Sequence, residues 1–176
     1  MRPFPAPQTR RALVPLLTLV TLLAVMAGAP ALATDAGEGA RGPLDGMDFV
    51  GDFGPAGGPA DSRDTLHFRD GRFWSGSCVP CGYPPGAYWV RVTGDGIHFR
   101  GELENPEGGR FVYVGVVRDG RIEAHINWRR ERWYWTIDRD FRFEGRIADV
   151  QPAYANVAAA REAAFGGPDP RRDCQP

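Results

Sequence analysis

Three Asp-Gly pairs at nearly equal intervals constrain the fold of this chain more than any other feature. They lie 25 and 24 residues apart, each between runs rich in Val, Ile, Phe, Tyr and Trp, at Asp70-Gly71, Asp95-Gly96 and Asp119-Gly120. The two central residues of a tight β-hairpin turn need positive φ angles, which Asp and Gly adopt at low cost. The pattern therefore predicts three two-residue hairpin turns in an antiparallel sheet.

The side chains that these turns would bring together support the prediction, because a hairpin turn fixes which residues share a face of the sheet. Apolar residues face each other in every hairpin: Phe68 with Phe73, Val92 with Phe99, Val117 with Ile122, Tyr113 with Ile126, and Phe111 with Trp128. Two further loops, at Arg129 to Arg132 and at residues 138–140, continue the pattern by pairing Trp128 with Trp133, Ile126 with Trp135, and Ile137 with Phe141. One surface of the sheet is therefore expected to be apolar throughout.

The sequence predicts an all-β domain over residues 45–150, built as an antiparallel up-and-down meander. Nine short strands are expected, at residues 46–53, 64–69, 72–76, 87–93, 97–104, 109–117, 121–128, 133–137 and 141–147. A flat sheet of this size would expose a large apolar face and two unpaired edges. Closure into a small barrel of eight to nine strands removes both, with an open half-barrel or a sandwich as alternatives.

A C-terminal helix is predicted over residues 151–166. This Ala-rich segment places Tyr154, Val157, Arg161 and Phe165 at helical spacing, and Gly166 follows its end. The strand at 109–117 carries valines on its outer face, and we expect the helix to cover them: Val112, Val114 and Val116. Residues 167–176 are expected to form a disordered tail.

The first 33 residues have the three parts of a cleaved signal peptide. Arg2, Arg10 and Arg11 precede the apolar run at 12–27, and the small-residue pattern Ala31-Leu32-Ala33 follows. The general secretory route fits best, with the twin-arginine route as the alternative. We therefore expect a periplasmic or secreted protein without a membrane span after cleavage, and a flexible lead-in at residues 34–44.

The charge of the mature chain argues against nucleic acid as a partner. The signal segment holds three of the 21 basic side chains and none of the 22 acidic ones, which leaves a net charge of -4 with neutral histidines. Proteins that bind nucleic acid carry a basic patch that neutralises phosphates. No nucleic-acid partner is therefore expected.

Cys78 and Cys81 frame a CVPC motif in a long loop. In an oxidising compartment we expect a local disulfide between them. A metal half-site is an alternative. A redox dithiol is a weaker one, because Pro84 and Pro85 prevent a helix from beginning just after the motif. Cys174, in the predicted tail, is expected to be unpaired or mixed in its pairing.

The three histidines do not predict a metal centre. His67, His98 and His125 each stand between apolar neighbours of their strand, so they are expected on the outer surface of the barrel. Side chains on the outside of non-adjacent strands diverge, which argues against a shared zinc site. No metal and no cofactor are predicted, and the chain contains no GxSxG, P-loop or dinucleotide-binding motif.

Large aromatic residues dominate the predicted inner face and are interrupted by glycines at 101, 115 and 145. Such a face either fills the barrel or leaves an apolar pocket. For a pocket, the predicted ligand-binding residues are Tyr88, Tyr113, Trp128, Trp133 and Trp135. The neighbouring loop from Arg129 to Arg132 presents arginines to an anionic group or pairs them with nearby acids.

The signal peptide, the short meander, the aromatic interior and the C-terminal helix together resemble the small exported lipocalin-like barrels of bacteria, over residues 44–165. The resemblance implies binding of a small apolar or amphipathic ligand in the barrel mouth, without catalysis. The alternative is a protein-interaction or inhibitor-type envelope module whose rim is formed by the CVPC loop and the Arg129 to Arg132 loop. A thiol or metal enzyme centred on Cys78 and Cys81 is a third hypothesis.

Overall fold

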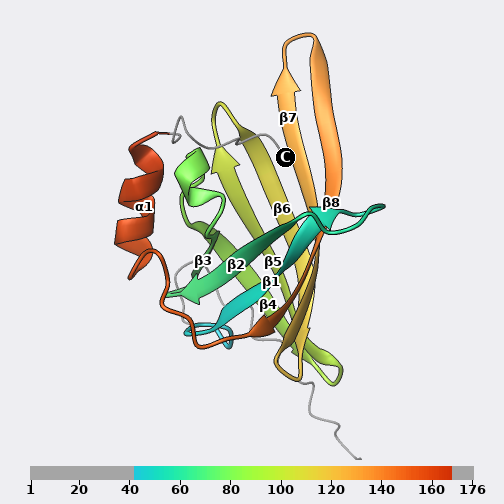
Figure 1. Cartoon of the computed structure of the whole chain (residues 1–176), viewed down its shortest axis with the longest axis vertical. Coiled ribbons are helices and arrows are strands. Elements are labelled where there is room, and N and C mark those ends of the chain that lie inside the picture. The colour runs from blue at the N-terminus through green and yellow to red at the C-terminus, as the bar shows by residue number, and fades with distance from the viewer. Residues whose placement is uncertain (1–41, 168–176) are drawn as a thin grey trace, which may run out of the picture. The chain divides into compact units, whose positions relative to one another are not determined.

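A computed structural model describes residues 42–167, and in them eight antiparallel strands close a barrel in sequence order (Figure 1). The strands are β1 (Asp48–Pro55), β2 (Ser62–Arg69), β3 (Arg72–Ser75), β4 (Gly86–Thr93), β5 (Gly96–Asn105), β6 (Gly109–Arg118), β7 (Arg121–Arg132) and β8 (Trp135–Ile147). A short 3-10 helix, η1 (Val79–Cys81), follows β3, and a helix, α1 (Val157–Phe165), follows β8. The predicted all-β barrel with one C-terminal helix is confirmed. The signal segment, most of the lead-in and Cys174 lie outside the described residues.

Two of the three Asp-Gly turns form as predicted. Asp70 and Gly71 have φ angles of 49° and 70°, and Asp119 and Gly120 have nearly the same values, 50° and 71°. Positive φ at both central positions matches the right-handed twist of the flanking strands. The predicted pairing therefore holds along both hairpins, as between Phe68 and Phe73.

The turn between β4 and β5 lies one residue earlier than predicted. Thr93 pairs with Gly96, so Gly94 and Asp95 occupy the turn. The Asp95 carboxylate accepts hydrogen bonds from the Thr93 hydroxyl before the turn (2.5 Å) and from a ring nitrogen of His98 after it (3.1 Å). These contacts fix Asp95 inside the turn. Phe99 consequently faces Val90 and not Val92.

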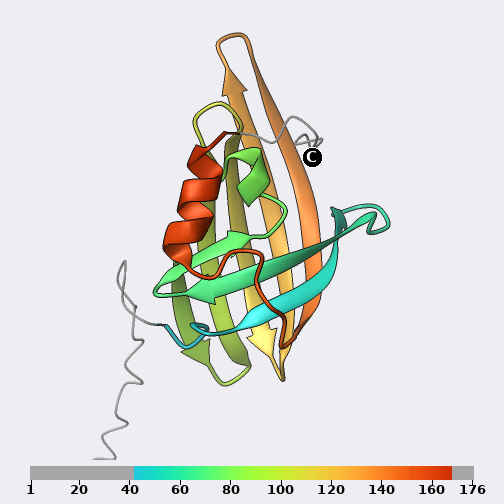
Figure 2. The same cartoon turned by 60° about the vertical axis from the view of Figure 1, so that its left-hand side comes forward.

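The last hairpin is longer than the sequence predicted. The loops expected at Arg129 to Arg132 and at residues 138–140 are wrong: β7 runs through Arg132, and β8 is one strand. Trp133 and Tyr134 form the turn, and Trp128 faces Arg139 instead of Trp133. The last pair between β6 and β7 is Arg110 with Arg129, and the last between β1 and β8 is Pro55 with Phe141. Residues 130–140, called the hairpin ribbon below, therefore extend beyond the neighbouring strands (Figures 1 and 2).

Aromatic rings fill the middle of the barrel. Phe68 lies at the centre of this packing, and its ring centroid is 5.1 to 5.9 Å from those of Phe49, Phe73, Tyr88 and Phe99. The inner-face glycines at 101 and 115 lie directly under the rings of Phe73 and Phe99, where a Cβ atom would collide with them. Of the two alternatives for the inner face, a filled barrel and an apolar pocket, the filled barrel therefore holds in this region.

Helix α1 packs on the outer face of β3, beside η1, and not on the valines of β6 (Figures 1 and 2). Ala160 and Ala164 bury Trp74 and Val79, whereas Val114 stays 48% exposed. The predicted covering of the valines is thus wrong: the helix covers the Trp74 indole and the η1 turn instead. Asn156 caps the helix, its side-chain oxygen accepting from the Ala159 N–H (2.9 Å). No helix within residues 42–167 has the length and apolar character needed to cross a membrane.

Candidate functional site

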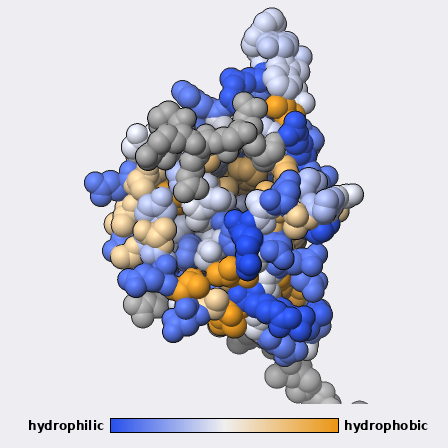
Figure 3. Space-filling view, in the orientation of Figure 1, coloured by the Kyte–Doolittle hydropathy of each residue, from blue (hydrophilic) through white to orange (hydrophobic). Residues whose placement is uncertain are grey.

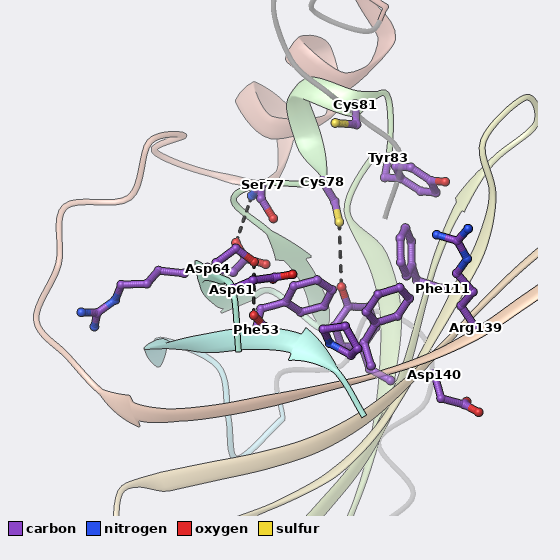
Figure 4. Close-up of a pocket in the computed structure, with 15 residues that line it drawn as sticks. Phe53, Asp61, Asp64, Ser77, Cys78, Cys81, Tyr83, Phe111, Arg139 and Asp140 are labelled. Carbon is purple, nitrogen blue, oxygen red and sulfur yellow. Dashed lines mark hydrogen bonds between the residues drawn. The ribbon is translucent and has the colours of Figure 1, made fainter. Parts of the chain in front are cut away.

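The barrel interior opens at one end into a cavity of about 580 Å³, called the mouth cavity below (Figure 4). Strands β1, β2, β6 and β8 and the η1 segment contribute its walls. Its aromatic lining consists of Phe53, Tyr83, Phe111, Tyr113 and Phe141, and its charged lining of Asp61, Arg63, Asp64, Arg139 and Asp140. This size and an apolar wall with a few polar groups are typical of small-molecule sites.

Ring contacts and hydrogen bonds hold the aromatic wall in place. Phe53 stacks on Phe141, with 5.1 Å between the ring centroids, and Tyr83 packs edge-on against Phe111 at 5.0 Å. The Tyr83 hydroxyl donates to the Gly108 carbonyl oxygen (2.7 Å) and receives the Trp128 indole N–H (3.3 Å). Burial raises the pKa of Tyr83 to about 12, so the ring stays neutral at ordinary pH.

A polar network around Asp64 forms one side of the mouth cavity. The Asp64 carboxylate is 8% exposed and accepts hydrogen bonds from the Ser75 hydroxyl (2.5 Å) and from the backbone N–H groups of Ser77 (3.0 Å) and Thr65 (2.7 Å). The Ser75 oxygen in turn accepts from the Cys78 N–H (3.1 Å). The network ties the start of η1 to β2 and fixes the positions of the side chains at the cavity wall.

Cys78 carries a free thiol, so the predicted disulfide between Cys78 and Cys81 is not formed. The Cys78 sulfur lies 3.9 Å from the Tyr113 hydroxyl, and the two sulfur atoms point in different directions (Figure 4). Burial, assisted by the Asp64 charge, raises the pKa of the Cys78 thiol to about 12. A thiol in this state is a weak hydrogen-bonding group and a poor nucleophile. Burial also raises the pKa of Tyr113 well above its ordinary value, which leaves a neutral hydroxyl in the wall.

Three of the five predicted ligand-binding residues lie inside the barrel, each in a different place. Tyr113 lines the mouth cavity. Trp128 is buried behind Tyr83, outside the lining. Tyr88 belongs to the packed interior, where its hydroxyl donates to Asp45 (2.7 Å). The structure thus brings Tyr113 and Trp128 to the mouth region and leaves Tyr88 out of it.

Trp133 and Trp135 do not lie inside the barrel, and their predicted inward placement is wrong. They are 93% and 44% exposed, at the end of the hairpin ribbon. The cause is the strand pairing, since each residue of β7 faces a β8 residue further along the chain than predicted. The two tryptophans are thereby carried past the barrel rim.

The sequence analysis missed three elements of the cavity: Phe53, Tyr83 and Asp64. Phe53 had a usable signal, because it alternates in phase with the buried Phe49 on β1. Tyr83 follows the CVPC motif, and its inward direction depends on η1. Asp64 also alternates in phase with the buried Leu66 and Phe68 on β2, but a carboxylate on a strand ordinarily indicates the solvent side, and the donors that hold it left no sequence signal.

The mouth-facing side of the hairpin ribbon is rich in arginine. Because Trp128 and Arg139 face each other on the inner side, the same side carries Arg130 and Arg132 of β7, and Ile137 of β8. Ile137 packs against the core, and Arg139 lines the cavity, as Phe111 does (Figure 4). The Asp140 carboxylate instead points away from the cavity. Positive charge therefore collects on this side of the ribbon, whereas the cavity lining itself also holds the carboxylates of Asp61 and Asp64.

The three histidines face outward as predicted, but His67 is not a surface residue. Its ring is buried, contacts the Asp48 carboxylate at 2.7 Å and stacks on Trp74 at 5.1 Å. His98 and His125 pair with exposed acids. Among residues 42–167, no three His, Cys, Asp or Glu side chains are grouped so that they could hold a metal ion.

A second hollow, of about 570 Å³, lies at the opposite end of the barrel between the hairpin turns. Its lining includes Val92 and Ile147, which are largely exposed, and none of the buried polar side chains of the described chain.

Comparisons with protein-family models, with curated proteins and with solved structures give no match. The geometry favours the mouth cavity as the functional site, because buried polar groups and a fixed aromatic wall occur there together.

Proposed function

We propose that this protein binds a small amphipathic molecule in the mouth cavity, with the apolar part among the aromatic rings and an acidic head group near Arg139. The observation that carries the proposal is the open cavity of about 580 Å³, whose walls are held in place by their own contacts. A preformed apolar pocket with a few fixed polar groups binds ligand without the cost of ordering its walls.

The architecture supports the same interpretation. An eight-stranded barrel is near the size at which the interior can hold one small ligand, and the lipocalins use the barrel mouth in this way. The aromatic packing around Phe68 would limit the depth of entry, so the ligand would occupy only the mouth half of the barrel. The proposal includes a location in the periplasm or outside the cell, which the signal-peptide pattern and the resemblance to exported lipocalin-like barrels support.

The state of the cavity groups favours binding over catalysis. A thiol with a pKa of about 12 is almost wholly protonated near neutral pH, and the nearby tyrosines are neutral as well. The alternative role, capture of a protein through the CVPC segment, has less support. Val79 is fully buried under α1 and the Cys78 sulfur points into the cavity, so the motif offers little surface to a partner.

The test is a titration of the mature chain with anilinonaphthalene sulfonate, an apolar anion whose fluorescence rises in apolar sites. We expect saturable binding, displacement of the dye by a long-chain fatty acid, and a change in the emission of Trp128, which contacts the cavity wall through Tyr83. Cys78→Phe would place a ring in the cavity and weaken binding at least tenfold.

The matched control is Val114→Phe, which adds a ring on the exposed outer face of β6. It should bind like the unmodified protein. Arg139→Gln should weaken binding of the anionic dye more than that of an uncharged apolar probe. Unchanged binding in a folded Cys78→Phe variant, or no binding by the unmodified protein, would contradict the proposal.

A further inference from the structure

Three consecutive aromatic residues at the end of the hairpin ribbon are exposed to solvent. Trp133, Tyr134 and Trp135 are 93%, 66% and 44% exposed, and their rings contact one another with centroids 4.6 and 6.0 Å apart. The space-filling view shows the ribbon end projecting, pale on the hydropathy scale, above strongly hydrophilic residues (Figure 3). Exposed clusters of large aromatic residues mark interaction sites, because each ring gains by leaving water.

The ribbon holds this cluster, called the aromatic tip below, well away from the barrel wall. The neighbouring strand β6 makes its last pair with β7 at Arg129. Trp133 lies four positions after Arg129, which at the rise of a β-strand is about 13 Å. A large partner can therefore reach the aromatic tip without contacting the barrel wall first.

Basic side chains flank the aromatic tip. Residues 129–137 contain three arginines, at 129, 130 and 132, and one acid, Glu131. Glu131 is paired with Arg129 at 2.9 Å on the outer side of the ribbon. Arg130 and Arg132 lie on the mouth-facing side. On a mature chain whose net charge is negative, the basic end of the ribbon is complementary to an anionic surface.

We propose that the aromatic tip inserts into the interface of a lipid bilayer that carries anionic head groups. Trp and Tyr are the residues enriched at membrane interfaces, where the ring lies among the acyl chains and its polar atom stays at the head groups. Trp133 and Tyr134 of the tip lie in the turn and Trp135 is the first residue of β8, with no aliphatic side chain among them. A protein groove would cover one side of such a ribbon, whereas a bilayer interface surrounds its end from all sides.

Docking of this kind would turn the mouth cavity toward the bilayer. The ribbon begins at the cavity, since Arg139 and Asp140 belong to both. Arg130 and Arg132 would then lie at the level of the phosphates. The docking proposal stands on the aromatic tip and its charges, and it does not require that the cavity binds a ligand.

The experiment is co-sedimentation of the mature chain with vesicles of phosphatidylcholine, with and without phosphatidylglycerol. We expect binding to the anionic vesicles with a blue shift of tryptophan emission. The double variant Trp133→Ser with Trp135→Ser should bind at least tenfold more weakly. Replacing Arg130 and Arg132 by Gln should weaken binding about thirtyfold on anionic vesicles at low salt, and much less on neutral ones.

Trp89→Ser is the matched control, because Trp89 is a 39% exposed tryptophan on the outer wall, at β4. It should leave vesicle binding unchanged, as should Cys78→Phe, which separates this proposal from the one on the cavity. Absence of vesicle binding, or unchanged binding in the double tryptophan variant, would overturn the proposal. So would a tip-dependent dimer in sedimentation velocity without vesicle binding, which would assign the tip to a second copy of the chain.

Discussion

Removal of the Asp64 carboxylate is the sharpest test of how the mouth cavity is held together. Its two oxygens accept three hydrogen bonds, from the Ser75 hydroxyl and from the backbone N–H groups of Ser77 and Thr65. Asp64→Ala deletes all three acceptor contacts and leaves the donors in a largely buried place. The segment that leads into η1 would lose its side-chain connection to β2 and keep only the backbone bond from the Gly76 N–H to the Thr65 carbonyl oxygen (2.9 Å).

The expected loss of stability can be worked out donor by donor. The Ser75 hydroxyl can turn to the Ser77 hydroxyl, which lies 3.0 Å away, so its cost is small. The two backbone N–H groups have no such alternative, and each costs roughly 1–3 kcal/mol when left unsatisfied in a buried place. Water entering from the cavity offsets part of this. We therefore expect Asp64→Ala to lower the free energy of unfolding by about 3 kcal/mol.

The measurement is urea denaturation followed by tryptophan fluorescence, with stability taken from the midpoint at unchanged slope. Asp64→Asn keeps one acceptor oxygen and should lose about half as much. Asp61→Ala, which removes an exposed carboxylate from the same cavity, should lose less than about 0.5 kcal/mol. If Asp64→Ala costs no more than Asp61→Ala, the network does not hold the cavity wall as described.

Three further predictions concern other parts of the barrel. Gly101→Ala forces a methyl group into the Phe73 ring and should cost about 2 kcal/mol in urea denaturation, whereas Gly94→Ala, with open space around it, should be nearly neutral; equal effects would contradict the packing. Alkylation of Cys78 at pH 8, followed by peptide mapping, should be about a thousandfold slower than for a thiol of pKa 9.0. The rate should rise tenfold per pH unit, because the fold favours the neutral thiol until the pH nears 12. A fast reaction at pH 8 would refute the buried thiol. Asn156→Ala should cost about 1 kcal/mol and Asn156→Asp much less, and equal losses would show that the cap does not stabilise α1.

The combination of a packed interior and an open mouth explains why the sequence left a filled barrel and a pocket as equal alternatives. Both descriptions apply, each to one part of the molecule. The glycines at 101 and 115 make room for the rings of Phe73 and Phe99, so they contribute no empty volume. The cavity arises instead where η1 and the loop after β1 leave the rings of Phe53 and Phe111 uncovered on one side.

The candidate site could be predicted only where a strand carries it. Tyr113 follows from alternation on β6, and the structure has it in the cavity wall. The arrangement of Cys78 and Tyr83 depends on the 3-10 turn between Val79 and Cys81, and Asp64 depends on donors that this turn presents. Such contacts join residues from separate elements and leave no periodic signal in the sequence, which is why the disulfide prediction failed and Asp64 was missed.

The sequence by itself determined which side of each strand faces inward. Alternation has a period of two, so it survives any change of pairing by an even number of residues. Moving the β4–β5 turn by one residue shifts each pair by two, and the actual partner of Trp128 lies six residues beyond the predicted one. In both hairpins each strand therefore kept the same inner side although the pairs changed, while Trp133 and Trp135 lie past the barrel rim and are exposed.

Only the tertiary structure decided how far β7 and β8 continue and what they carry past the rim. The length of a ribbon depends on the hydrogen bonds between its two strands and on where the neighbouring strands stop, and alternation is silent on both. The segment from Arg129 to Asp140 was compatible with two short loops or with one long hairpin. In the closed barrel this segment forms one long hairpin, so Trp133 and Trp135 lie at an exposed tip and not in the predicted pocket.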